Sequence, residues 1–299
     1  MATKGRARKK NTLYIWVQVA MVVLVLLLCG ALVGKSLMDR AAAPQTDPSQ
    51  SQGPDDGSES GTPPTETEGT TIPADTSPEG IKEAFLKEHN LTEDDYLPKM
   101  FEVYEYFPEV REFILNYPLM KDNYPTSSDI SGYDRTNGIP LFIQWDPAWG
   151  YTPYGKGVCG TSACGAVCMS MVAYYLTGNT EYTPHYMMEF ARKNGHMGSG
   201  GGTNWSMFSV GSTQLGFYVK EVGLDENVIR RKLEAGIPIV VNVGPGDFTR
   251  NGHYMVLSGY EDGKIRINDP FSVINSQKLW EFDRIKSQIK NLWEIRLPD

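Results

Sequence analysis

The sequence has little clustered positive charge beyond its first residues. It carries 28 Lys and Arg against 36 Asp and Glu, a formal net charge of -8 over 299 residues. A basic cluster occurs only at the N-terminus, between Lys4 and Lys10, and no basic stripe follows it. Surfaces that bind nucleic acid need clustered Lys and Arg to meet the phosphate backbone. Nothing in the sequence therefore predicts a nucleic-acid partner.

Cysteine and histidine are also scarce, with 4 of each. Cys159, Cys164 and Cys168, taken with one histidine, do not match the ligand spacing of a zinc site. The glycine-rich stretch 195–202 is not a phosphate-binding loop, because no Gly-Lys-Ser/Thr follows it. We therefore predict no metal and no cofactor.

One long apolar run is present near the N-terminus. Residues 13–33 are almost wholly apolar, and about 20 such residues suffice for a helix to span a bilayer. We predict a transmembrane helix at 13–34, with 1–12 as a basic cytoplasmic tail and the C-terminal part outside the cell. The alternative is a signal peptide cleaved near Ala41–Ala43, although the apolar run is longer than usual for one.

The next two segments differ sharply in composition. Residues 41–78 contain no Lys or Arg and are rich in Pro, Ser, Thr, Gly, Asp and Glu, so we predict a disordered acidic linker over 35–78. Residues 79–124 hold two helical patterns, the second broken near Pro108, whose apolar spacing suits packing on the following domain. We predict a structural helical subdomain here, with a substrate-binding or inhibitory segment as the alternative.

Residues 125–299 are long enough for one domain with an ordinary core. A central helix is predicted over 164–176, ending at Gly178, and a second helix from Asp225 to Ala235. Strands are predicted at 238–243, 253–260, 264–268 and 292–296, with a short strand inside 139–146. This order, a helix followed by a mainly antiparallel sheet, is typical of an α+β fold.

Cys164 is the candidate nucleophile. It lies where a loop gives way to the apolar helix, and a helix N-terminus lowers the pKa of a thiol. Cys168, one turn later, lacks that position, and Cys159 could pair with Cys168 or stay free. Gly165 leaves room beside the thiol for a substrate, so we predict that it contributes to substrate binding.

His253 and Asp269 are the candidate base and its orienting carboxylate. They follow one another on two strands joined near Asp262-Gly263. A regular two-residue turn would put Asp269 opposite Val256, on the wrong face for His253. A three-residue loop with a bulge at Gly263, or another bulge nearby, would put it opposite Met255, on the correct face. The hypothesis therefore requires a bulge.

Three further residues are predicted to serve the same site. Gln144 is the best side-chain donor to an oxyanion, because a neutral amide donates without competing for the proton. Gly252 precedes His253 and is predicted to border the substrate. Trp205 is predicted to anchor the glycine-rich loop as a mobile cover of the cleft, in contact with substrate.

These residues resemble a known family. Residues 135–296 are similar to cysteine peptidases related to the bacteriocin-processing, double-glycine-cleaving peptidases, in their stand-alone secreted branch. The matching stretches are Ile139-Pro140-Leu141 running to Gln144, Cys164-Gly165 with its helix, Gly246-Asp247-Phe248-Thr249 with Gly252-His253-Tyr254, and Asn268-Asp269-Pro270. The resemblance implies a papain-like fold, a Cys164–His253–Asp269 triad and Gln144 in the oxyanion hole. The sequence departs from the family at Ala166-Val167, where Pro-Thr is common, and at Val158, where transporter-fused members have Gln.

Taken together, these observations predict a membrane-anchored extracytoplasmic thiol peptidase, at the surface of a Gram-positive bacterium, acting on peptide or protein substrates. Two alternatives remain open: a cell-wall peptide amidase with the same triad, and an inactive papain-like module that binds peptides.

Overall fold

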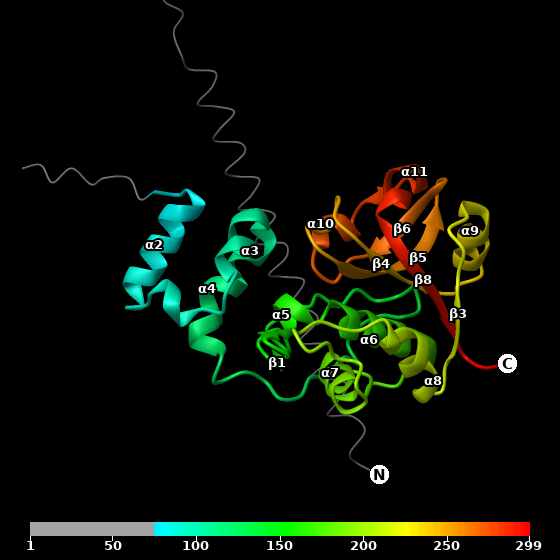
Figure 1. The fold of residues 1–299 in the computed structure, drawn as a ribbon, viewed down its shortest axis with the longest axis horizontal. Coiled ribbons are helices and arrows are strands. Elements are labelled where there is room, and N and C mark those ends of the chain that lie inside the picture. Colours follow the sequence, from blue (N-terminus) through cyan, green and yellow to red (C-terminus); the bar gives the residue numbers. More distant parts are fainter. Residues whose placement is uncertain (1–74) are drawn as a thin grey trace, which may run out of the picture. The chain divides into compact units, whose positions relative to one another are not determined.

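The computed structural model describes residues 75–299, which are drawn in colour in Figure 1. The predicted cytoplasmic tail, the predicted transmembrane helix at 13–34 and most of the predicted linker lie outside these residues. Within 75–299, no helix has both the length and the apolar character needed to cross a membrane.

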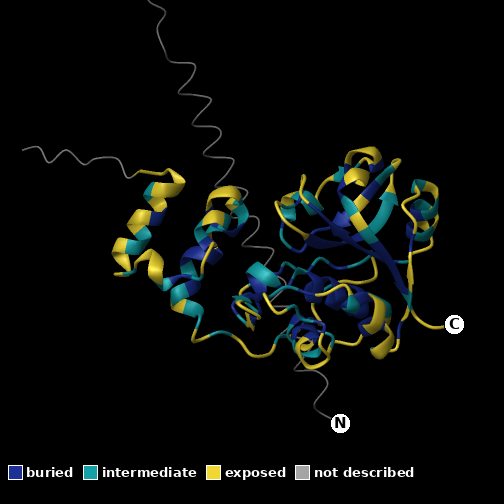
Figure 2. Ribbon diagram, viewed as in Figure 1, coloured by how far each residue is buried: buried dark blue, intermediate teal, exposed yellow. Residues whose placement is uncertain are grey.

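The described chain begins with a group of short helices. These are α2 (Pro78–Glu88), η1 (Glu93–Asp95), α3 (Met100–Tyr106), η2 (Pro108–Val110) and α4 (Arg111–Met120). Ser77 caps α2, because its hydroxyl accepts a hydrogen bond from the Gly80 N–H. The predicted break near Pro108 is present, since the ring of proline fits the first turn of η2 but not a helix interior. Figure 2 shows α2 largely exposed, whereas α4 buries Phe113, Ile114 and Leu115.

The domain predicted over residues 125–299 contains a six-stranded antiparallel sheet with the order β3-β8-β4-β5-β6-β7. The four predicted strands are present as β4 (Ile239–Val243), β5 (His253–Glu261), β6 (Lys264–Asn268) and β8 (Ile289–Arg296). The edge strands β3 (Tyr218–Glu221) and β7 (Leu279–Trp280) were not predicted, because they are short and have no buried residue. A separate two-residue hairpin pairs β1 (Pro153–Tyr154) with β2 (Gly157–Val158).

The strand predicted inside 139–146 is wrong. This segment is irregular and is held by single bonds rather than by a ladder: Gln144 N–H donates to the Pro270 carbonyl over 2.7 Å, and Asn268 Nδ2 donates to the Ile139 carbonyl over 2.8 Å. Pro140 lacks the N–H that a ladder needs. The segment therefore packs against the end of β6 without joining the sheet.

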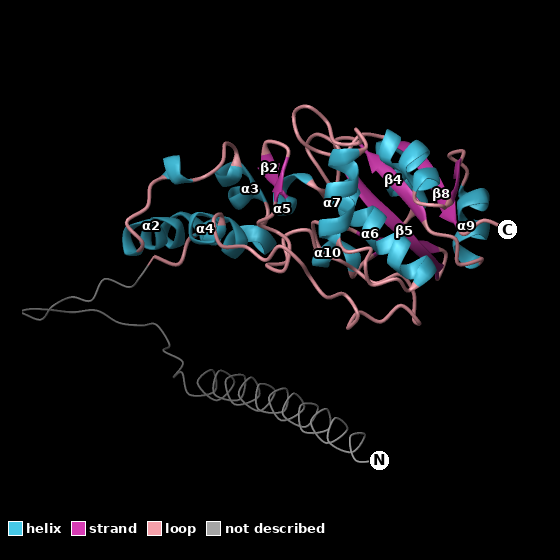
Figure 3. Cartoon of the chain, turned by 90° about the horizontal axis from the view of Figure 1, so that it is seen from below, coloured by secondary structure: helices cyan, strands magenta, loops and turns pink. Residues whose placement is uncertain are grey.

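Helices cover both faces of the sheet. Successive residues of a strand point to opposite faces, and both faces of the central strands carry apolar side chains. Val240, Tyr254 and Val256 face the cluster formed with α6 (Cys164–Thr177) and α7 (Pro184–Lys193). Val241 and Met255 face α9 (Glu226–Glu234) and α11 (Phe282–Ile285). Figure 1 shows β4 and β5 between α6 and α11, and Figure 3 shows α6 and α7 lying across the strands. The remaining short helices are α5 (Cys159–Ser162), η3 (Met207–Gly211), α8 (Ser212–Gln214), α10 (Val273–Ser276) and η4 (Lys286–Gln288).

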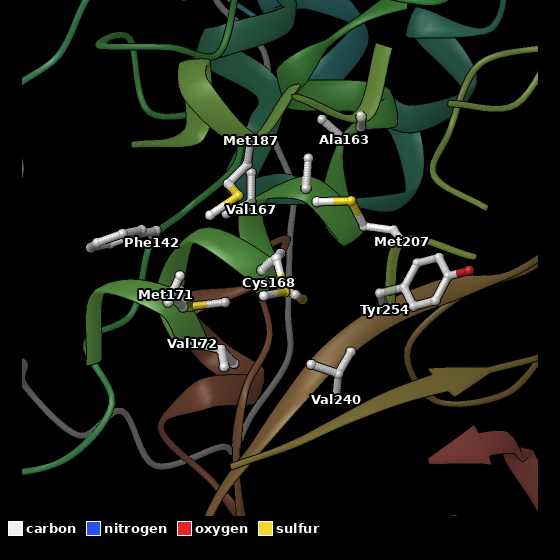
Figure 4. Packing of buried hydrophobic residues seen from close by; sticks show 14 of the residues in the cluster. Phe142, Ala163, Val167, Cys168, Met171, Val172, Met187, Met207, Val240 and Tyr254 are labelled. Carbon is white, nitrogen blue, oxygen red and sulfur yellow. The ribbon is translucent and has the colours of Figure 1, made fainter. Parts of the chain in front are cut away.

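Helix α6 is the centre of the domain, as predicted. It ends at Gly178, whose φ of 69° is the left-handed conformation that glycine adopts readily. Every residue from Gly165 to Tyr174 is buried, which is typical of a core helix that is apolar all round. Figure 4 shows the Cys168 side chain inside this core, near Met171 and Val240.

The hairpin between β5 and β6 differs from the predicted loop but reaches the predicted register. Glu261 pairs with Lys264 across a two-residue turn, in which Asp262 and Gly263 have φ of 52° and 77°. The bulge lies further along, at Ser258, so that Leu257 pairs with Ile267 and Val256 with Asn268. Asp269 consequently follows on opposite Met255. The three-residue loop is wrong, and the alternative of a nearby bulge is correct.

Candidate active site

The N-terminus of α6 borders a cavity of about 530 Å³. Cys164 is the first residue of that helix, is half-buried and lines the cavity. The first N–H groups of a helix have no partner within it, so they and the helix dipole favour a negative charge at this position. The thiol therefore lies at a helix N-terminus and where a substrate can reach it.

His253 lines the same cavity from the first position of β5. Its Nε2 donates a hydrogen bond to Asp269 Oδ1 over 2.7 Å, and both side chains are buried. A neutral imidazole with its proton on Nε2 keeps Nδ1 as the acceptor. The bond thus fixes the tautomer and the orientation of the ring, with Nδ1 free to meet the thiol.

Asp269 is itself held in place by three further hydrogen bonds, two to its carboxylate and one from its backbone. Oδ1 also accepts from the Phe271 N–H over 2.9 Å, and Oδ2 accepts from Asn275 Nδ2 over 2.9 Å. The Asp269 N–H donates to Ser276 Oγ over 2.9 Å. Asn275 and Ser276 belong to α10, which sequence reasoning did not connect with the site. The only sequence signal was an amide and a hydroxyl shortly after Asp269-Pro270.

The charge state of His253 follows from these neighbours. Burial lowers the pKa of His253, but the negative charges of Asp269 and of a Cys164 thiolate, with hydrogen bonds to both groups, raise it to about 10. The imidazolium form is therefore favoured at neutral pH. A thiolate beside an imidazolium is the pair of groups that nucleophilic cysteine chemistry uses.

The other two described cysteines have no such setting. Cys159 and Cys168 are fully buried, and neither forms a disulfide. Burial raises the pKa of both thiols well above the ordinary value, and the nearby Cys164 charge raises it further. The possible Cys159–Cys168 pairing is wrong for this structure. Of the three thiols, only that of Cys164 is accessible.

Gln144 lies beside the thiol in the lining of the cavity and is buried. Its Nε2 donates to the Gly160 carbonyl over 2.9 Å, while its Oε1 has no hydrogen-bond partner among the described residues. An amide nitrogen carries two N–H groups, so this bond occupies one of them. The second N–H is the donor that an oxyanion would need.

The three predicted substrate contacts fare differently. Gly252 lines the cavity, and its contact with substrate stays a prediction. Gly165 does not: it is buried under Thr203, whose Cβ would lie 2.6 Å from a Cβ added at Gly165. Glycine is needed there for close packing, and the prediction of a substrate contact at Gly165 is wrong.

Trp205 is also absent from the cavity lining, so the structure does not bring it to the site with Cys164 and His253. It packs edge-on against Trp293, with ring centroids 5.6 Å apart. The preceding loop is tied down by a β-bridge between Met197 and Thr203 and by His196, whose ring bonds Ser206 and Gln214. Only Gly202 and Thr203 of this loop reach the cavity.

Sequence reasoning kept residues 79–124 open as a substrate-binding segment but named none of its residues at the site. Helix α3 and its flanking residues contribute five lining residues, and the loop from β4 to β5 contributes Phe248, Thr249, Arg250 and Asn251. Within residues 75–299, no group of three His, Cys, Asp or Glu side chains could hold a metal ion.

The model of the Peptidase_C39 like family matches residues 136–296, more than half of the sequence. The chain belongs to this family. The resemblance seen in the sequence motifs is thereby confirmed, together with the papain-like α+β fold of the domain. No curated protein matches the chain in sequence.

Two solved structures are similar to this member of the Peptidase_C39 like family. One is the peptidase domain of Streptococcus ComA, a bi-functional ABC transporter involved in a quorum-sensing pathway, with 23% identity and a TM-score of 0.35 over 45% of this chain and 91% of that chain. The other is described as a C39-like peptidase from Bacillus anthracis, with 16% identity and a TM-score of 0.32 over 57% of this chain and 98% of that chain.

Proposed function

We propose that this protein is a cysteine peptidase that cleaves peptide bonds through an acyl-enzyme. The supporting observation is one arrangement: the accessible Cys164 and the buried His253 line a single cavity, and His253 is hydrogen-bonded to Asp269. Membership of the Peptidase_C39 like family favours the same chemistry. We retain the predicted anchor at 13–34 as part of the proposal, with the peptidase domain on the outer side of the membrane.

In the acylation step, Cys164 Sγ attacks the carbonyl carbon of the scissile amide and forms a carbon–sulfur bond. The His253 imidazolium gives its proton to the amide nitrogen, the carbon–nitrogen bond breaks, and the amine leaves. In the second step, His253 takes a proton from water, the resulting hydroxide attacks the thioester, and the thiolate leaves with the carboxylic acid as the second product. Asp269 stabilises the imidazolium throughout.

The negative oxygen of each tetrahedral intermediate needs hydrogen-bond donors. The Cys164 N–H at the start of α6 and the second Nε2–H of Gln144 are the proposed pair. Preorganised donors of this kind contribute about 3–4 kcal/mol to lowering the barrier in other acyl-transfer enzymes. Gln144→Ala is therefore expected to lower kcat by roughly 10²–10³-fold.

A thiol-reactive probe tests the nucleophile. Iodoacetamide applied to the native full chain should alkylate Cys164, as mapped by mass spectrometry, and should leave Cys159 and Cys168 unmodified until the protein is denatured. Cys164→Ser should abolish this labelling and Cys168→Ser should retain it. Equal labelling of Cys168 in the native protein would contradict the proposal.

A peptide library tests the reaction. Cleavage by the wild type, absent in Cys164→Ser and in His253→Ala, supports a peptidase. Turnover of peptidoglycan fragments without cleavage of any protein or linear peptide would instead identify the amidase. Labelling of Cys164 with no turnover of either class would leave a binding module and reject the proposed reaction.

A further inference from the structure

We propose that helix α3 is a substrate-recognition element of this site, and that its face formed by Val103, Tyr106 and Phe107 is a subsite for a bulky apolar side chain of the peptide. The inference rests on the proposed peptidase function for the identity of the ligand. It assigns a role to the N-terminal helices that goes beyond structural support.

The three residues share one face of the helix. Positions 103, 106 and 107 are related by the i, i+3 and i+4 spacing that places side chains side by side. All three line the cavity that contains Cys164 and His253, although they belong to the N-terminal helices and lie far before Cys164 in the chain. Tyr106 keeps 51% of its surface exposed, so its ring is accessible to a ligand in the cavity.

Three further aromatic residues, Phe248, Tyr254 and Phe271, contribute to the same cavity. Three charged residues of the α3 side and the β4–β5 loop also line it, and they are Lys99, Glu102 and Arg250. Lys99 and Glu102 have opposite signs, and the Arg250 guanidinium lies over the Tyr106 ring. Pockets lined by aromatic and aliphatic groups bind apolar side chains by removing them from water, which contributes about 25 cal/mol per Å².

This wall is fixed rather than loose. The Glu109 carboxylate, just after α3, accepts hydrogen bonds from the Ser272 hydroxyl and from the Ile274 N–H at the start of α10. Phe107 packs edge-on against Phe271 with ring centroids 5.0 Å apart, and Phe271 packs edge-on against His253 at 6.3 Å. The subsite is thus tied to the same segment that positions Asp269.

The loop before His253 also joins the wall. The Arg250 guanidinium lies over the Tyr106 ring, 3.4 Å from its centroid. This cation–π contact links α3 to the β4–β5 loop and forms one border of the cavity. A side chain in the subsite would lie between the Arg250–Tyr106 pair and Phe271.

The helix leaves the nucleophile accessible. Cys164 is half-buried and borders about 530 Å³ of open cavity while α3 is in place. An inhibitory segment would fill that space. The geometry therefore favours a permanent wall of the binding site over the inhibitory alternative considered from the sequence.

Paired peptides test the subsite through the ratio of their binding affinities, which does not depend on catalytic activity. The full chain carrying Cys164→Ala would be titrated with peptides of equal length that differ at one position, Leu against Gly, with that position moved along the peptide. At one position the Leu peptide should bind at least about 10-fold more tightly. Adding Val103→Ser should reduce that preference to about 2-fold or less.

Glu105→Ser is the matched control, because Glu105 lies on α3 outside the cavity and the substitution has a similar cost in helix propensity. It should leave the ratio unchanged. Val103→Phe provides a second test that needs no loss of packing: filling the subsite should reverse the preference toward the Gly peptide. Thermal unfolding monitored by circular dichroism checks that each variant is folded.

The outcomes separate this inference from the proposed function. Two results overturn the subsite even if the wild type cleaves peptides. One is a Leu preference that is the same in the Val103→Ser, Val103→Phe and Glu105→Ser chains. The other is a parent Cys164→Ala chain with no preference at any position. Selective binding that depends on Val103, in a protein that cleaves no peptide, supports the subsite and rejects the peptidase.

Discussion

His253 Nε2 and Asp269 Oδ1 are 2.7 Å apart, although His253 begins β5, Asp269 follows the end of β6, and a regular two-residue hairpin would put them on opposite faces. The bulge at Ser258 is what restores the register. Its hydroxyl donates to Asn268 Oδ1 over 2.9 Å, beside Asp269, and lies 3.3 Å from the Arg266 carbonyl. The irregular position in β5 is therefore part of the site.

Ser258→Ala is expected to destabilise the fold by about 1–2 kcal/mol, because it leaves the buried amide oxygen of Asn268 without a donor. Urea-induced unfolding of the full chain would measure the change. Ser258→Thr keeps the hydroxyl and should restore most of the stability. If Thr and Ala destabilise equally, the hydroxyl does not hold the bulge.

Asp269→Asn should lower kcat/KM by roughly 10²–10⁴-fold while leaving the fold intact, since an amide in this place can hold the imidazole in the wrong tautomer. Peptide cleavage by purified enzyme would measure it, once a substrate is known. Asn275→Ala removes one neutral donor to Asp269 and should cost far less, about 10-fold or below. Comparable losses in the two variants would contradict the assigned order of importance.

The pH dependence of His253 follows from its raised pKa. A group whose pKa is raised on folding stabilises the native state fully below its unfolded value, about 6.5 for histidine, and this contribution is lost as the pH rises through about 10. NMR titration of the imidazole should show His253 protonated well above pH 8. Asp269→Asn should move the transition downward.

His185 provides an internal contrast for that titration. Burial lowers the pKa of His185, and the hydrogen bond to the Pro125 carbonyl only partly offsets this effect. The pKa of His253 should therefore lie above the ordinary histidine value and that of His185 below it. A His253 signal that titrates near pH 6.5 in the wild type would show that the ion pair does not form.

The parts of this protein that follow local rules were predictable from sequence. The helix that starts at Cys164, its end at Gly178 and the strands of the hairpin depend on apolar periodicity, glycine conformation and turn chemistry, all of which are local. The need for a bulge also followed from counting residues between His253 and Asp269. The position of the bulge at Ser258 could not be predicted, because it depends on side-chain hydrogen bonds between the two strands.

The residues that were missed depend on contacts between distant segments. Gly165 was assigned to substrate because nothing in its own sequence shows that Thr203 lies against it. Asn275 and the α3 wall reach the site only through packing of separate helices. Periodicity indicated that residues 98–117 would pack on the domain, but it could not indicate that Val103 and Tyr106 would border the nucleophile.

The contact between α4 and the rest of the domain leads to the last prediction. The Phe113 ring fills a space between two glycines: a Cβ added at Gly160 or Gly150 would lie 2.3 or 2.8 Å from its atoms. It also stacks on Tyr151, with ring centroids 4.5 Å apart. Because Phe113 is buried, Phe113→Ala should reduce the free energy of unfolding by about 3–5 kcal/mol.

Leu119 supplies the matched control on the same helix, since it is 45% exposed and Leu119→Ala should change stability by no more than about 0.5 kcal/mol. Both changes would be measured by chemical denaturation of the full chain. Gly160 also offers its carbonyl to Gln144 Nε2, so loss of the Phe113 ring should in addition lower kcat through a displaced Gln144. If Phe113→Ala costs no more than Leu119→Ala, α4 does not brace the domain at this point, and Gly150 and Gly160 are not needed to accommodate its ring.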